Sequence, residues 1–223
     1  MGAYLAASLK ETLRDLGGWA LAAAGVFLLW VGVALDILAI DSAPGRIWLL
    51  GWGTVELVSV LAALARACQL GGVPEGAGDL DDAIVSTRLG PHGLLLSQWL
   101  SAVGRGALIG LPTITLLLVY YSQSSGAAPG LGLGAFLLSL GAWLVVLAAA
   151  AAWGLVLARA VGVAGGFLAS LTLFVLARSG ALPATVAGLF PPALGTGLDL
   201  LSAAAAVLAT TGCLAAAAAL RAR

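Results

Sequence analysis

This sequence has unusually few charged residues. Only 9% of its 223 residues are Asp, Glu, Lys or Arg, whereas soluble proteins average about a quarter. Hydrophobic residues make up 61% of the chain, and the mean hydropathy is +1.10. This composition excludes an ordinary soluble domain. It predicts an all-α integral membrane protein in which residues 1–223 form a single transmembrane domain.

The few charges are balanced, with ten basic and ten acidic residues. The chain therefore lacks the basic surface that collects phosphates, which excludes nucleic acid as a partner. Histidine occurs once and cysteine twice, and Cys68 and Cys213 have no metal-ligand spacing, so we expect them to be buried small residues. HExxH, GxSxG and P-loop motifs are also missing, so we predict no catalytic residue, metal or cofactor in this chain.

Apolar stretches long enough to cross a hydrocarbon core of about 30 Å follow one another along the chain. In front of them, residues 1–16 place leucines opposite charges, which predicts an interfacial helix. A short joint at Arg159 separates the fourth stretch from the fifth. We predict six spans, at 17–40, 47–67, 94–121, 131–157, 161–177 and 200–220.

The stretch before the last span, residues 178–199, is apolar but rich in proline and glycine. Proline prevents one continuous helix, and the apolar character does not fit a solvated loop. We expect a broken or re-entrant segment on the outer side of the membrane.

Orientation follows from the loops that collect Lys and Arg, because such loops stay in the cytoplasm. With six spans, both termini and the 72–93 loop lie on one side. That side holds most of the basic residues, whereas only Arg46 and Arg178 fall on the other. We therefore expect both termini in the cytoplasm.

Most of the chemistry of the chain falls in the 72–93 loop and the start of the third span. Asp79 and the aspartates after it fit the first turn of a short helix, from Asp79 to Arg88, where they accept hydrogen bonds from free N–H groups. Gly90 and Pro91 then predict a turn into the third span. His92 follows this turn, where we assign it no role.

The same aspartates allow an alternative. Asp79, Asp81 and Asp82 are three carboxylates close in sequence, and paired carboxylates hold hard cations such as Mg²⁺. A membrane-embedded enzyme that acts on lipid phosphates is therefore a rival interpretation. A non-catalytic membrane assembly subunit is another.

Two ionisable residues, Glu56 and Arg105, lie inside predicted spans. A charge at this depth costs several kcal/mol unless it is paired or hydrated. Glu56 lies about 13 Å along its helix from Ile47, and Arg105 about 16 Å from Leu94, so they reach similar depths. We predict an ion pair between them. Two alternatives are that such a pair only locks two helices, or that Arg105 extends to the cytoplasm.

The order Gly78, Leu80, Asp81, Ile84, Val85 and Ser86, followed by a span, resembles the first cytoplasmic loop of type-2 ABC exporters, the ABC-2 permease superfamily. The sequence departs from that pattern at Asp79, where the superfamily favours Thr, and at Thr87, where it often has Pro. A narrower likeness, to the membrane component of the haem exporter of cytochrome c maturation, rests on length and on Gly110-Leu111-Pro112.

The resemblance implies a permease subunit that moves an apolar or amphipathic substrate and is not itself an enzyme. A separate cytoplasmic ABC ATPase would hold the ATP and Mg, and a second permease subunit, identical or different, would complete the unit in a bacterial-type inner membrane. The resemblance also implies an outer gate at Pro183, Pro191 and Pro192. The residues that it implies for coupling to the ATPase are Glu75, Gly78, Asp79, Leu80, Asp81, Ile84, Val85 and Arg88.

Cysteine labelling tests the predicted orientation. In a background without Cys68 and Cys213, we expect Ser125→Cys to react with an impermeant reagent outside intact cells, because the 122–130 loop is predicted to be external. Gly76→Cys should react only after the membrane is permeabilised. The reverse pattern would contradict the orientation and, with it, a cytoplasmic partner for the 72–93 loop.

Overall fold

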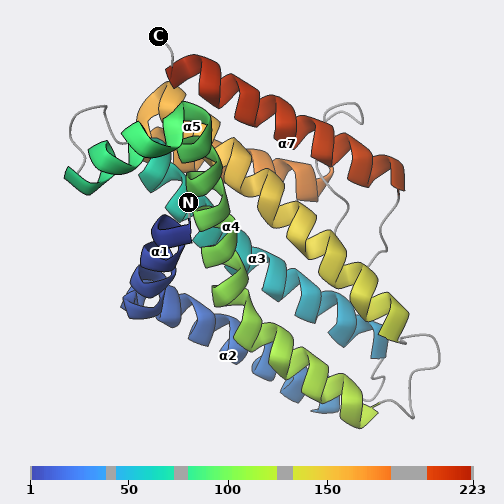
Figure 1. The fold of residues 1–223 in the computed structure, drawn as a ribbon. Helices are drawn as coiled ribbons and strands as arrows, with labels where there is room; N and C mark the ends of the chain where they lie inside the picture. Colours follow the sequence, from blue (N-terminus) through green and yellow to red (C-terminus); the bar gives the residue numbers. More distant parts are fainter. Residues whose placement is uncertain (1, 39–43, 73–79, 125–132, 182–199, 222–223) are drawn as a thin grey trace.

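A computed structural model of the chain describes residues 2–38, 44–72, 80–124, 133–181 and 200–221. Every regular element in these ranges is an α-helix, which confirms the predicted all-α class. Four helices are long and apolar enough to cross a membrane, and they are α2 (Leu16–Leu38), α3 (Pro44–Gly71), α4 (Leu80–Ser124) and α5 (Leu133–Ser179). A short helix, α1 (Gly2–Arg14), precedes them, and α7 (Leu200–Arg221) follows (Figure 1).

Asp15 forms the corner between α1 and α2. Its carboxylate accepts hydrogen bonds from the backbone N–H groups of Gly17 and Gly18, both at 3.1 Å, and these are the free donors in the first turn of α2. Across the corner, the indole N–H of Trp19 donates to the carbonyl of Leu13 at 3.0 Å. The side chains of Asp15 and Trp19 therefore help to set the angle between α1 and α2 (Figure 1).

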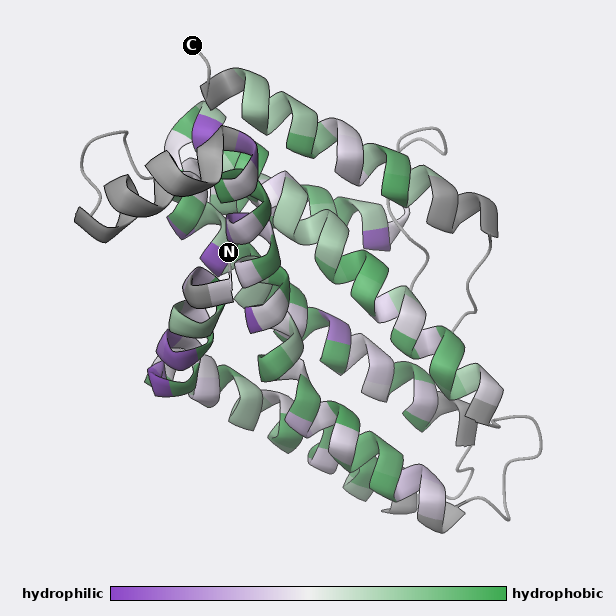
Figure 2. Ribbon diagram, viewed as in Figure 1, coloured by the Kyte–Doolittle hydropathy of each residue, from purple (hydrophilic) through white to green (hydrophobic). Residues whose placement is uncertain are grey.

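The central helix is α3, which packs against α2, α4 and α5. In the apolar part of α3, 67% of the residues are buried, whereas only 22% are buried in that of α2. Trp52 and Leu64 of α3 meet Leu117 of α4 and Leu147 of α5 in one large apolar cluster. Apolar residues cover most of the helices (Figure 2), so the few polar contacts between helices stand out.

Helix α5 consists of two helical arms joined at Gly162. This residue has φ 80° and ψ 173°, a conformation that glycine adopts without steric cost. The chain reverses direction here, so that the second arm packs against the first (Figure 1), and a Cβ at Gly166 would overlap the backbone of Ala158. The joint was expected at Arg159. It lies at Gly162 instead, because the glycine can take the positive φ while Arg159 remains helical.

Helix α4 joins two elements that were predicted to be separate. The helix expected to begin at Asp79 and the span expected at 94–121 form one element from Leu80 to Ser124. The chain changes direction after the first turns of α4 (Figure 1), as the turn predicted at Gly90 and Pro91 requires, but it does so within a helix and not through a separate turn. A proline inside a helix removes one backbone hydrogen bond, and long apolar helices tolerate this where other groups satisfy the freed carbonyl.

Close packing of α4 against its neighbours depends on Gly106. A Cβ added there would stand 2.8 Å from the carbonyl oxygen of Ser59, 2.9 Å from Cβ of Ala63 and 3.0 Å from a methyl of Leu147. Two of these residues are in α3 and one is in α5. Only a hydrogen atom fits between the three helices at this point, as is common where apolar helices pack through small residues.

We expect Gly106→Ala to lower the free energy of unfolding by about 1–3 kcal/mol, because the backbone carbonyl of Ser59 cannot move away as a side chain would. Gly104→Ala is the matched control in the same helix, since a Cβ there would meet nothing within 4 Å. It should leave stability unchanged or raise it slightly, because alanine favours helix more than glycine does. Denaturant titrations in detergent measure both. Equal effects would contradict the close contact.

Candidate functional site

Glu11 ties α1 to the central helix through Arg66. The Nη1 atom of Arg66 donates to Oε1 of Glu11 at 3.0 Å, and Nη2 donates to Oε2 at 2.5 Å. Two parallel bonds form the bidentate geometry in which guanidinium and carboxylate bind most strongly. Arg66 is only 8% exposed, so its charge depends on this partner. The pair therefore fixes α1 against α3.

A second ion pair joins Arg105 of α4 to Asp15. The side chain of Arg105 is 13% exposed and that of Asp15 is 28% exposed. Because the Asp15 carboxylate also caps α2, it holds α4 against the start of that helix. The predicted pair between Arg105 and Glu56 is wrong, since the structure gives each residue another partner.

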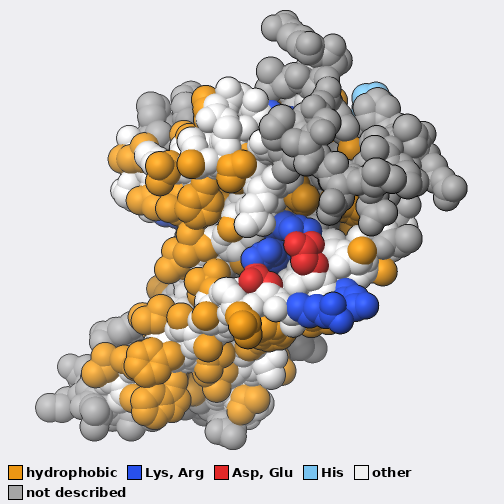
Figure 3. Space-filling view, turned by 90° about the vertical axis from the view of Figure 1, so that its left-hand side faces the viewer, with side chains coloured by type: hydrophobic (Ala, Val, Ile, Leu, Met, Phe, Trp, Pro, Cys, Tyr) orange, Lys and Arg blue, Asp and Glu red, His pale blue; other side chains and the backbone are white. Residues whose placement is uncertain are grey.

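Two hydroxyl groups extend the first of these ion pairs. Ser8 of α1 and Ser101 of α4 are buried and hydrogen-bonded to each other, and Nε of Arg66 donates to Oγ of Ser101 at 3.5 Å. In Figure 3, acidic and basic side chains gather in one patch at the hollowed part of this face, between apolar regions. We call the network the α1 clasp, and its members are Ser8, Glu11, Asp15, Arg66, Ser101 and Arg105.

Glu56, near the middle of α3, pairs with Arg178 in the last turn of α5. The Nε atom of Arg178 donates to Oε1 of Glu56 at 2.5 Å, and Nη2 contacts the same oxygen. The Glu56 side chain is 6% exposed, and the guanidinium lies 5.3 Å from the ring centroid of Phe174. Arg178 was expected in the 178–199 segment, but α5 continues to Ser179 and brings it to this acid.

Arg159 makes polar contacts near the bend of α5. It donates to Oε1 of Gln98 in α4 at 2.9 Å and to the backbone carbonyl of Ala217 in α7 at 2.6 Å. The amide of Gln98 in turn donates to the carbonyl of Leu70 in α3 at 3.4 Å. These bonds connect four helices through two side chains.

Gln98, Ser101 and Arg105 are spaced three and four residues apart, so they lie on one face of α4. Gln98 reaches α5 and α3, Ser101 reaches α1 and α3, and Arg105 reaches the start of α2. We call these three residues the polar stripe of α4. The spacing is visible in the sequence and could have identified the stripe, although the sequence does not show the partner of each residue.

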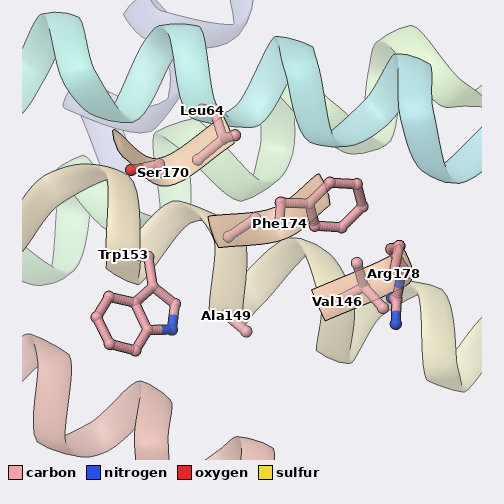
Figure 4. A pocket seen from close by; sticks show the side chains of 8 residues that line it. Leu64, Val146, Ala149, Trp153, Ser170, Phe174 and Arg178 are labelled. Atoms are coloured by element: carbon pink, nitrogen blue, oxygen red, sulfur yellow. The ribbon is translucent and has the colours of Figure 1, made fainter. Parts of the chain in front are cut away.

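A small apolar cavity lies between α3 and the two arms of α5. Figure 4 shows Ser170 beside Leu64 at one end and Arg178 at the other, with Phe174 between them. Ser170 is 3% exposed, and its hydroxyl has no hydrogen-bond partner among the described residues. Ser170 and Arg178, the partner of Glu56, thus line the same cavity. Its lining residues are Leu64, Val146, Ala149, Ala150, Trp153, Ser170, Phe174 and Arg178.

The residues predicted to couple to an ATPase lie partly outside the described residues. Glu75, Gly78 and Asp79 are outside them, as are the predicted gate residues Pro183, Pro191 and Pro192. At the start of α4 the structure describes the backbone but not the side chains of Leu80, Asp81, Ile84, Val85 and Arg88. Their roles remain predictions.

The remaining chemical candidates are few. Cys68 and Cys213 are free and buried, as predicted. Among the residues whose side chains are described, no group of three or more His, Cys, Asp or Glu is placed to hold a metal ion. No family model, curated protein or solved structure matches the chain.

A double-mutant cycle tests the revised pairing of Glu56. We expect Glu56→Gln and Arg178→Gln each to lower the free energy of unfolding by about 3–5 kcal/mol, because each leaves an uncompensated buried charge. The double variant should lose much less than the sum of the two. Glu56→Gln combined with Arg105→Gln is the control, and its effects should add, since those residues belong to separate pairs. Additivity in the first cycle would contradict the pair.

Proposed function

We propose that this chain is an integral membrane protein with six spans, formed by α2, α3, α4, the two arms of α5, and α7. Four helices of sufficient length and apolarity support this, as does the reversal of α5 at Gly162. In this arrangement α1 lies at the cytoplasmic interface. The class of protein is a multi-pass component of a bacterial-type inner membrane.

Within this class, we propose the permease subunit of an ATP-driven exporter of the ABC-2 type. A separate cytoplasmic ATPase would bind ATP and Mg and dock on the start of α4, and a second permease subunit would complete the transporter. The substrate would be apolar or amphipathic, in keeping with walls built mainly of Ala, Leu and Val. The resemblance in residues 78–86 supports the docking segment.

The observation that carries the proposal is the continuity of α4. The residues that resemble a coupling loop begin this helix, and the same helix continues past Arg105 to Ser124. The helix bends after its first turns (Figure 1), and Pro91 removes one backbone hydrogen bond, but the chain stays helical from Leu80 to Ser124. Movement of a partner at Ile84 and Val85 would therefore reach the polar stripe through a bent helix and not through a loop.

The polar stripe contacts several other helices, so a movement of α4 would be transmitted to each of them. Gln98 connects α4 to Arg159 near the bend of α5. Ser101 and Arg105 connect it to the α1 clasp and, through Asp15, to the start of α2. A partner that shifts α4 would thus displace both sides of the bundle together, as alternating access requires.

The test is co-purification of the full chain with the ATPase encoded by the neighbouring reading frame. We expect Ile84→Asp to insert normally but to lose at least tenfold in ATPase binding, as for a charge placed at an interface hot spot. Asp82→Asn is the matched control, because helical spacing puts residue 82 on the opposite face of the helix from residue 84. This variant should retain the ATPase.

Each rival function predicts a different result in this experiment. A lipid-phosphate enzyme would show metal-dependent phosphate release from the purified chain alone, and Asp82→Asn would abolish it. An assembly subunit would co-purify no ATPase. Undiminished binding of the ATPase by Ile84→Asp would mean that the start of α4 is not the coupling element.

A further inference from the structure

The outer face of α1 combines leucines with positive charge. Leu9 is 47% exposed and Leu13 is 50% exposed, and Lys10 and Arg14 are exposed beside them. Spacings of three and four residues make these side chains neighbours on the helix surface: 9 beside 13, 10 beside 14, and 10 beside 13. One exposed arc of α1 is thus half apolar and half basic.

The acids of α1 and its corner do not neutralise this arc, because each is paired with an arginine of another helix, although the Glu11 side chain is itself 61% exposed. Glu11 is held by Arg66 and Asp15 by Arg105, and the buried hydroxyls of Ser8 and Thr12 lie on the inner side of the helix. In sequence, α1 and its corner carry equal numbers of acidic and basic residues. The α1 clasp engages both carboxylates with Arg66 and Arg105, and so leaves the charges of Lys10 and Arg14 unmatched.

We infer that the outer face of α1 binds anionic phospholipid headgroups. Helices that lie in a membrane interface bury leucines at the boundary between headgroups and acyl chains and present Lys and Arg to anionic lipid. The basic groups of Lys10 and Arg14 are the complement of lipid phosphate, and Leu9 and Leu13 are the complement of the upper acyl chain.

The position of α1 favours lipid over a protein partner. Helix α2 is long and apolar enough to cross a membrane and begins at Leu16, which is 84% exposed. Trp19, which is 39% exposed, lies one turn further, and tryptophan is enriched where a membrane meets water. The corner at Asp15 therefore holds α1 at the end of a span, at headgroup depth. This inference rests on membrane insertion and not on transport or on an ATPase.

The test uses the full chain with Cys68→Ala, Cys213→Ala and Leu9→Cys, labelled with an environment-sensitive dye. It is reconstituted in vesicles of phosphatidylcholine with a minor fraction of phosphatidylglycerol, and bromine is carried on the acyl chains of one lipid or the other. We expect both brominated lipids to quench the dye. Quenching by the anionic lipid should exceed its share of the membrane by roughly fivefold for each basic residue at low salt.

Three controls make this preference specific to the two cations. Lys10→Gln with Arg14→Gln should abolish the preference, whereas Lys10→Arg with Arg14→Lys should keep it because both charges remain. A dye at Leu28→Cys, on the exposed side of α2, should show no preference, and added salt should weaken it at position 9. Quenching in proportion to lipid composition at position 9, or no quenching there, would overturn the inference.

Discussion

The position of the helices depends on one constraint, which is that a charge inside an apolar bundle must have a partner. Each of three arginines meets this need with an acid on another element: Arg66 with Glu11, Arg105 with Asp15, and Arg178 with Glu56. Removing the acid of a pair leaves a largely desolvated arginine, which costs more than the intact pair contributes. These pairs therefore act as fixed points, while apolar contacts between Ala and Leu surfaces would allow several alignments of the same helices.

Close packing provides the second constraint, and it depends on the first. Gly106 lets α4 approach the backbone of α3, and its neighbour Arg105 then reaches Asp15. A smooth apolar surface alone does not specify how far one helix is displaced along another, because neighbouring registers bury similar area. The ion pair selects one register and the glycine allows the short distance, so the two features define the position of α4 together.

The sequence predicted the helices much better than the contacts between them. Long apolar stretches identify α2 to α5 because length and hydropathy are local properties. The bend of α5 was expected three residues too early, since Arg159 is the conspicuous polar residue whereas Gly162 takes the positive φ. The choice of partner in an ion pair, by contrast, depends on residues far apart in the sequence. Glu56 was assigned to Arg105 by depth alone, but rotation about the helix axis decides which acid an arginine meets. Arg178 was placed beyond the span that in fact contains it.

Because charged residues are few in this chain, those that form no ion pair indicate what surrounds the protein at their position. The clasp and the Glu56 pair use acids and arginines to hold helices together, and within the described part of the chain they leave Lys10 and Arg14 on the surface without an acid. A free cation on a largely apolar chain is maintained only where water or an anion solvates it. Since both cations stand beside exposed leucines, their surroundings must be polar on one side and apolar on the other. A membrane surface that contains anionic lipid provides both conditions at one depth.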